Sequence, residues 1–124
     1  MSDAEILICD DEPQIRALYE RVLTQAGYRC DQAAEGREAF RMLNRRSYRL
    51  VILDINMPEW NGVDAIVSMQ LVHPEQRVLV ISGFLDDAVR KLLDETKAVL
   101  GYLEKPVKPS VLLERVKAAL EPGT

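Results

Sequence analysis

Short apolar runs alternate along this chain with longer segments in which apolar residues recur every three or four positions. Three runs are continuous, at residues 6–9, 50–53 and 78–81. Such runs are typical of strands that are buried on both faces of a parallel sheet. Two further runs, 28–33 and 99–103, carry polar residues. We therefore predict three central strands and two edge strands.

Five segments between and after these runs have the periodicity of amphipathic helices. Pro13 opens the first helix and Gly27 follows its end, which are positions that proline and glycine favour. Pro109 opens the last helix in the same way. The predicted inner faces comprise Ile15, Leu18, Tyr19, Val22, Leu23 and Ala26; Ala39, Phe40 and Leu43; Val63, Ile66, Val67 and Gln70; Ala88, Val89, Leu92 and Leu93; and Leu112, Leu113, Val116, Ala119 and Leu120.

Five repeats of strand and helix predict an α/β fold with right-handed crossovers and helices on both faces of the sheet. Because the first, third and fourth strands are the most apolar, they should be central. This gives a doubly wound, five-stranded parallel sheet of the flavodoxin-like type, with strand order 2-1-3-4-5. The 124 residues suit one domain, and we expect a single domain over 1–124 with a core of about residues 5–121.

The balance of basic and acidic residues limits the kinds of partner that we expect for this chain. Sixteen basic and twenty acidic residues give a net charge of −4, so nothing favours a nucleic-acid partner. The amino terminus has no signal-peptide pattern, and no apolar run approaches the ~18–20 residues that span a bilayer. We therefore expect a cytoplasmic protein without membrane contact.

Polar side chains follow the strands at the edge of the sheet where α/β proteins bind ligands. They are Asp10, Asp11 and Glu12 after the first strand, Asp54 after the third, Ser82 after the fourth and Lys105 after the fifth. Two carboxylates ~4 Å apart repel by roughly 4 kcal/mol at an effective dielectric of ~20. Either one carboxyl group stays protonated or a cation neutralises the set. A set of oxygen ligands suits Mg²⁺, or Mn²⁺ in its place.

Transfer of a phosphoryl group is chemistry that this set can perform. Asp54 stands alone after the middle strand, so it is the best candidate for a nucleophile. Lys105 can hold one phosphoryl oxygen and Ser82 another. Glu12 is expected to be only a surface acid near a helix amino terminus. Phe84 either shields the site or packs beside it.

The chain resembles the receiver domain of two-component response regulators, the CheY-like family. The matching residues are Asp10-Asp11, Asp54-Ile55-Asn56-Met57-Pro58 followed by Gly62, Ser82-Gly83, Tyr102 and Lys105-Pro106. The resemblance implies that Asp54 is phosphorylated by a histidine kinase or a histidine phosphotransfer protein. It implies that Asp10, Asp11, Asp54 and the main-chain carbonyl of Asn56 hold Mg²⁺, and that Lys105 pairs with the phosphoryl group across a cis Lys105–Pro106 bond.

The resemblance also implies an output. Ser82 and Tyr102 would act as the switch, and a downstream protein would bind the face formed by the fourth helix, fifth strand and fifth helix. We expect no output domain, no further cofactor site, and a monomer or weak dimer. Residues 96–101 lack the Gly-Ala pair that many relatives carry in this turn, so the local geometry stays open.

Two other functions compete with this one. A receiver-fold scaffold that works without phosphorylation would normally lack part of the acidic set, whereas this chain keeps all of it. An aspartyl-nucleophile phosphatase needs an acid two residues after the nucleophile, and Asn56 stands there. We therefore expect a phosphoacceptor that assists its own phosphorylation and dephosphorylation, and no enzyme that turns over external substrates.

Overall fold

Strands and helices alternate strictly along the chain in the computed structural model, which describes residues 3–57 and 62–121. The elements are β1 (Ile6–Cys9), α1 (Pro13–Gln25), β2 (Cys30–Ala33), α2 (Gly36–Arg45), β3 (Leu50–Leu53), α3 (Gly62–Val72), β4 (Val78–Ser82), α4 (Asp87–Glu95), β5 (Val99–Glu104) and α5 (Pro109–Leu120). The predicted order of elements is confirmed.

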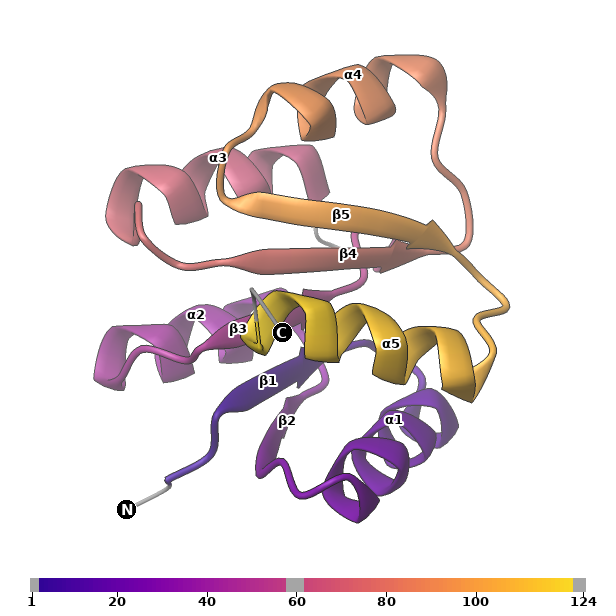
Figure 1. Ribbon diagram of the computed structural model, residues 1–124. Helices are drawn as coiled ribbons and strands as arrows, with labels where there is room; N and C mark the ends of the chain where they lie inside the picture. Colours follow the sequence, from indigo (N-terminus) through magenta and orange to yellow (C-terminus); the bar gives the residue numbers. More distant parts are fainter. Residues whose placement is uncertain (1–2, 58–61, 122–124) are drawn as a thin grey trace.

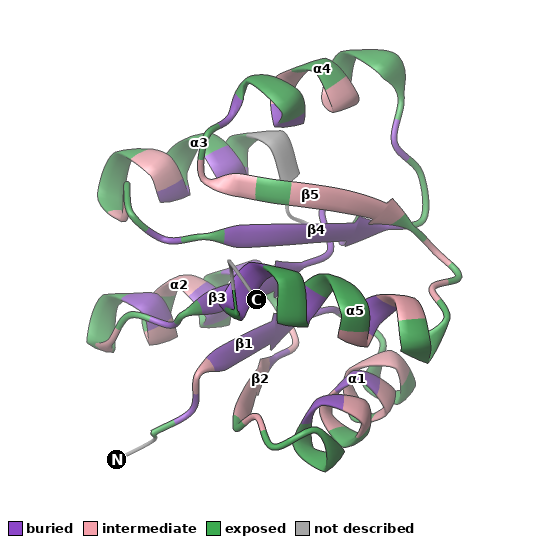
Figure 2. Cartoon of the chain, viewed as in Figure 1, coloured by how far each residue is buried: buried purple, intermediate pink, exposed green. Residues whose placement is uncertain are grey.

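The strands form one parallel sheet in the order β2-β1-β3-β4-β5, as predicted. Figure 1 shows α1 and α5 in front of this sheet and α2 and α3 behind it. Every residue of β1, β3 and β4 is buried, whereas β2 and β5 are mostly half-buried (Figure 2). The hydrophobicity of the strands therefore predicted correctly which strands are central and which lie at the edges of the sheet.

Two hydrophobic cores lie on opposite faces of the sheet, because successive residues of a strand point to opposite sides. Leu7, Val51 and Val80 pack toward α2, α3 and α4. Their neighbours Ile8, Ile52 and Ile81 pack toward α1 and α5. The continuous apolar runs are thus explained by burial on both faces.

Helix ends agree with the sequence signals, but some boundaries and three predicted inner-face residues do not. Ala26 and Ala88, predicted to face the core, are exposed. Gly27 has φ 98, a left-handed conformation that glycine adopts without strain. The second strand begins at Cys30, later than predicted, and β5 continues to Glu104. In α3 the prediction for Val67 was wrong, since Val67 is 42% exposed while Ala65, Ile66 and Met69 are buried. An apolar helix with few polar positions gives a poor periodicity signal.

Residues 96–101, left open by the sequence, contain a β-bulge at the start of β5. In the register of β4 and β5, Val78 pairs with Val99 but Leu79 pairs with Gly101. Leu100 is therefore an extra residue, and it is 43% exposed. Upstream, α4 ends at Glu95, and the hydroxyl of Thr96 donates to the carbonyl of Leu92.

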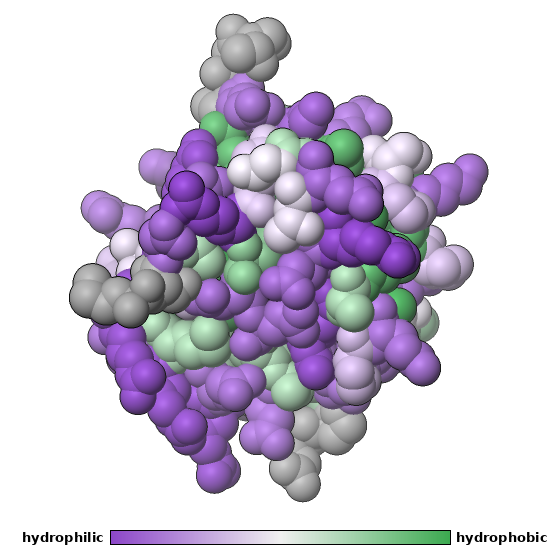
Figure 3. Space-filling model, turned by 90° about the horizontal axis from the view of Figure 1, so that it is seen from below, coloured by the Kyte–Doolittle hydropathy of each residue, from purple (hydrophilic) through white to green (hydrophobic). Residues whose placement is uncertain are grey.

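The face seen in Figure 3 is largely hydrophilic, with hydrophobic residues in small separate patches. Among the described residues, no helix combines the length and the apolar character that a bilayer crossing requires.

Leu112→Ala should destabilise the fold by about 2–5 kcal/mol, because Leu112 is 0% exposed where α5 packs on the sheet. The matched control is Leu71→Ala, whose side chain in α3 is 79% exposed. That variant should stay within about 0.5 kcal/mol of the parent protein in urea unfolding. Equal losses in the two variants would contradict the assigned core.

Candidate functional site

The carboxyl ends of β1 and β3 carry two aspartates that are almost inaccessible to solvent. Asp10 is 2% exposed and Asp54 is 4% exposed. These strands are neighbours in the sheet, so the residues that follow them lie side by side. The main-chain N–H of Asp54 donates to the carbonyl of Cys9 at 3.0 Å, which joins the two strand ends.

The ammonium of Lys105 lies between these carboxylates. Its Nζ is 2.8 Å from Asp10 Oδ2 and 3.1 Å from Asp54 Oδ2, and the side chain is only 15% exposed. The main-chain N–H of Lys105 donates to the carbonyl of Ser82 at 2.8 Å, which fixes where the side chain starts. The Lys105–Pro106 peptide bond is cis, as predicted. The three residues predicted to meet at this edge are therefore together.

In each of these aspartates the two carboxylate oxygens have different partners. Asp10 Oδ1 accepts from the main-chain N–H of Glu12 at 2.9 Å, and Asp54 Oδ1 accepts from that of Asn56 at 2.8 Å. One oxygen of each carboxylate thus holds its own loop, while Oδ2 faces Lys105. This fixes the orientation of both carboxylates.

Burial and charge act in opposite directions on these groups. Burial raises the pKa of Asp54 above its ordinary value, although the Asn56 N–H and Lys105 both favour the carboxylate. Burial alone would lower the pKa of Lys105, but its hydrogen bonds to Asp10 and Asp54 raise that pKa overall. The lysine is therefore charged throughout the neutral range, and ionised Asp54 gains from a nearby cation.

Asp11 and Glu12 extend the acidic set toward solvent. One carboxylate oxygen from each of Asp10, Asp11 and Glu12 lies within 4.8 Å of the other two. Glu12 is exposed, as expected, but it does more than decorate the surface, because its Oε1 is 3.3 Å from Lys105 Nζ. Sequence reasoning missed this contact, although an acid adjacent to the Asp pair was the available signal.

Ser82 and Asn56 form the wall of the site on the β4 side. Ser82 is 0% exposed, and its hydroxyl lies 3.5 Å from the carbonyl of Phe84. The side-chain oxygen of Asn56 accepts from the main-chain N–H of Phe84 at 3.1 Å. The ring of Phe84 is 66% exposed, so it packs against little within the described residues. Pro58, at the end of the predicted motif, lies outside them.

The hydroxyl of Tyr102 donates to Asp94 of α4 in this structure. The distance to Asp94 Oδ1 is 3.0 Å, so the ring is directed to α4. Arg90 of α4 forms an ion pair with Glu104 of β5 on the same side. The hydrogen bond to Asp94 raises the pKa of the Tyr102 hydroxyl. The predicted switch residues thus belong to the neighbouring strands β4 and β5, and their hydroxyl groups lie near different partners, the carbonyl of Phe84 and the carboxylate of Asp94.

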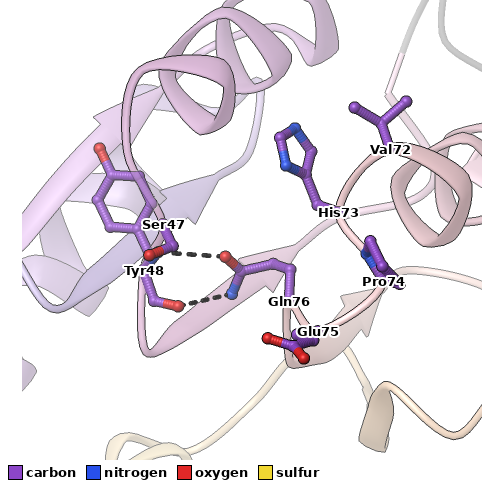
Figure 4. Close-up of a pocket in the computed structure, with 7 residues that line it drawn as sticks. All are labelled: Ser47, Tyr48, Val72, His73, Pro74, Glu75 and Gln76. Carbon is purple, nitrogen blue, oxygen red and sulfur yellow. Dashed lines mark hydrogen bonds between the residues drawn. The ribbon is translucent and has the colours of Figure 1, made fainter.

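A separate cavity of about 420 Å³ lies at the opposite end of the sheet (Figure 4). Its lining comes from the loops before β3 and β4. Gln76 joins these loops, because its amide accepts from the N–H of Tyr48 and donates to the carbonyl of Tyr48. No predicted site residue lines this cavity, so the candidate chemistry belongs to the carboxyl ends of the strands.

A doubly wound sheet whose strand ends hold two buried aspartates around one lysine is the arrangement of a receiver domain. The sequence agrees, since residues 6–117 match the response regulator receiver domain family. The chain belongs to this family, the receiver domains of two-component response regulators.

Individual relatives agree with this membership. The chain is 32% identical over 111 residues to the chemotaxis protein CheY of Thermotoga maritima, covering 88% of this chain and 91% of that protein. It is 34% identical over 120 residues to the transcriptional regulatory protein GlrR of Escherichia coli K12. That match covers 95% of this chain and 26% of GlrR, so the chain spans about a quarter of the length of that relative.

One solved structure has the same fold as this chain and the same sequence identity to it as CheY of Thermotoga maritima. The response regulator TrrA of Thermotoga maritima, solved in complex with Mg²⁺-BeF, superposes with a TM-score of 0.79 at 32% identity. The superposition covers 93% of this chain and 97% of that one. The sheet order and the positions of the helices therefore agree with a known receiver domain.

Lys105→Met should destabilise the protein by about 3 kcal/mol at pH 7, because two buried carboxylates lose their cation. The loss should be smaller at about pH 4 than at pH 7, because burial raises the pKa of Asp54 and a protonated Asp54 carboxyl group no longer needs the ammonium. Urea unfolding at both pH values measures this. Exposed Lys117→Met is the control, and a Lys105→Met loss independent of pH would contradict the assignment.

Proposed function

We propose that Asp54 accepts a phosphoryl group from the phosphohistidine of a histidine kinase or a histidine phosphotransfer protein. The observation that carries the proposal is the contact of Lys105 with Asp54 Oδ2 at 3.1 Å, at the edge where Asp10 is buried. A carboxylate beside a fixed ammonium is prepared for a reaction in which negative charge spreads over phosphoryl oxygens.

In this proposal Asp54 Oδ2 attacks phosphorus while the bond from phosphorus to the histidine nitrogen breaks. The nitrogen keeps the electron pair of the broken bond. Asp54 Oδ1 stays hydrogen-bonded to the Asn56 N–H, which keeps the nucleophile oriented. Lys105 then pairs with a phosphoryl oxygen, and the buried hydroxyl of Ser82 donates to another.

The structure gathers carboxylate oxygens of Asp10, Asp11 and Glu12 within 4.8 Å of one another, and such oxygen donors suit Mg²⁺, or Mn²⁺ in its place. Asp10, Asp11, Asp54 and the main-chain carbonyl of Asn56 would hold the ion. When bound, the ion would neutralise charge on the carboxylates and on the phosphoryl oxygens. The Mg²⁺-BeF complex of TrrA supports this assignment by similarity.

The proposed output is a change in protein–protein contact at the face formed by α4, β5 and α5, with Ser82 and Tyr102 as the switch. The Tyr102–Asp94 hydrogen bond and the Arg90–Glu104 ion pair hold α4 to β5 before phosphorylation. Occupation of Ser82 by a phosphoryl oxygen would shift the balance between two arrangements of this face. We further propose a cytoplasmic monomer or weak dimer.

Turnover of external substrates is not part of the proposal. The residue two positions after Asp54 is Asn56, whose side-chain oxygen already accepts a hydrogen bond from Phe84. An amide in this place offers no carboxylic acid to protonate a leaving group. Any loss of the phosphoryl group would therefore be hydrolysis of the domain's own aspartyl phosphate.

Incubation with acetyl phosphate and Mg²⁺ should add one phosphoryl group to the protein, as read by intact mass. Asp54→Ala should abolish the addition, and so should chelation of the metal by EDTA. The control is Asp87→Ala, an exposed acid at the start of α4, which should be modified like the parent protein. Absence of incorporation in folded protein that binds Mg²⁺ would favour the scaffold alternative.

Mg²⁺ together with beryllofluoride should raise the free energy of unfolding by about 2.7 kcal/mol at a ligand concentration 100-fold above Kd. Asp11→Asn should weaken Mg²⁺ binding by about tenfold or more while the fold is retained, because Asp11 is exposed. Thermal unfolding with and without EDTA measures both effects. Stabilisation of the Asp11→Asn protein equal to that of the parent would remove Asp11 from the metal site.

A further inference from the structure

A series of hydrogen bonds connects the middle of α1, the edge strand β2 and the loop that follows β1. Glu20 Oε2 accepts from the side-chain amide nitrogen of Gln32 at 2.6 Å. The oxygen of the same amide accepts from Arg16 Nε at 3.1 Å. Arg16 Nη1 in turn donates to the main-chain carbonyl of Asp10 at 2.6 Å. The series therefore ends on one of the two buried aspartates of the candidate site.

The topology of the chain brings these side chains together. Arg16 and Glu20 are four positions apart in α1, so they lie on the same face of that helix. Gln32 lies in β2, where it pairs with Ile8 of β1. Figure 1 shows α1 beside β2 at this edge of the sheet. A residue of the edge strand therefore bridges a cation and an anion of the helix.

The guanidinium of Arg16 is directed at neutral oxygen atoms. Among residues 3–57 and 62–121 it forms no ion pair with a carboxylate, and the amide of Gln32 lies between it and Glu20. A guanidinium can hold two acceptors in a fixed relation, because its N–H groups point in fixed directions. Arg16 therefore connects β2 to the carbonyl of Asp10.

The loop that Arg16 holds carries the acidic residues. The N–H of Asp10 donates to the carbonyl of Ala33 at 3.1 Å, and Asp10 Oδ1 accepts from the N–H of Glu12 at 2.9 Å. The carbonyl of Glu12 accepts from the N–H of Arg16 at 3.1 Å, where α1 begins. Asp11 is exposed and lies between these residues, so the main chain on either side sets its position.

Two effects of Arg16 on a nearby Mg²⁺ would have opposite signs. Its positive charge repels a cation, so the charge alone would weaken binding. Its hydrogen bond to Asp10 orders the loop in advance, so less conformational freedom is lost when an ion binds. Groups that orient metal ligands typically change metal affinity by about 10–100-fold. The charge of a half-buried side chain is screened by water and salt, so the ordering effect should prevail.

We propose that Arg16 is a positioning residue for the metal site, held in place by Gln32, and that it raises the affinity for Mg²⁺ by ordering residues 10–12. The inference rests on the proposed function, because it takes Asp10 and Asp11 as ligands of the ion. It adds that a basic residue outside the acidic set, anchored on β2, determines the affinity. Arg16 does not reach the ion or the phosphoryl group in this role.

The test titrates Mg²⁺ alone into the full chain by isothermal calorimetry, without any phosphoryl donor. Arg16→Met should raise the Kd for Mg²⁺ by about tenfold, although it removes a positive charge. Arg16→Lys keeps the charge but loses the forked donor, so it should resemble Arg16→Met. Arg21→Met removes an exposed charge of α1 and should not raise Kd. An unchanged or lower Kd in Arg16→Met would overturn the proposal.

Two further measurements separate positioning from a general loss of structure. Gln32→Leu should raise Kd by a smaller factor, and Arg16→Met/Gln32→Leu should bind Mg²⁺ no more weakly than Arg16→Met, because both residues act through one series of bonds. In the metal-free protein, Arg16→Met should lower the ¹⁵N order parameters of Asp11 and Glu12 but not that of Val51 in β3. Additive losses, or unchanged order parameters in residues 10–12, would contradict the positioning role. Thermal unfolding establishes that each variant is folded, and Gln32→Leu carries the test if Arg16→Met does not fold.

Modification by acetyl phosphate distinguishes this inference from the proposed function. The half-saturating Mg²⁺ concentration should rise about tenfold in Arg16→Met, whereas the rate at saturating Mg²⁺ should stay within about twofold of the parent rate. Phosphorylation of the parent protein together with an unchanged Kd in Arg16→Met would overturn the positioning role alone. A raised Kd in a chain that accepts no phosphoryl group would overturn the phosphoacceptor role alone. Absence of Mg²⁺ binding in the parent protein would overturn both.

Discussion

The contact of one lysine with two buried aspartates is the interaction on which the site depends. Two carboxylates that share one ammonium lie close enough to repel each other, and burial increases the cost of ionising Asp54. The ammonium of Lys105, 2.8 Å from Asp10 and 3.1 Å from Asp54, offsets that cost. The carboxylate of Asp54 can therefore stay ionised while it is buried.

This contact depends in turn on the topology of the sheet. Asp10 and Asp54 follow adjacent strands, while Lys105 follows β5, which is separated from β3 by β4. The lysine reaches across the end of β4, and its main-chain N–H is held by the carbonyl of Ser82. The backbone of Ser82 therefore lies beside that of Lys105, so the ends of β4 and β5 border the site together with the ends of β1 and β3.

The two ends of the sheet differ in their polar contacts. At the amino ends of β3 and β4, polar contacts fasten elements together: Gln76 joins two loops, and Arg49 and Arg77 donate to the last carbonyls of α5. Cations suit the carboxyl end of a helix because its carbonyls carry partial negative charge. The carboxyl ends of β1 and β3 instead hold buried acids around the ammonium of Lys105.

The sequence by itself determined the order of elements, the strand order and the identity of the acidic set. Each of these follows from local patterns, such as the apolar runs of β1, β3 and β4 and the polar residues directly after them. Tertiary structure alone decided the contact of Glu12 with Lys105, the outward face of Val67 and the bulge at Leu100. Glu12 and Lys105 are 93 residues apart in the sequence. Whether two such side chains meet, and which register a strand adopts, depends on how separate elements pack, and no local sequence pattern encodes this.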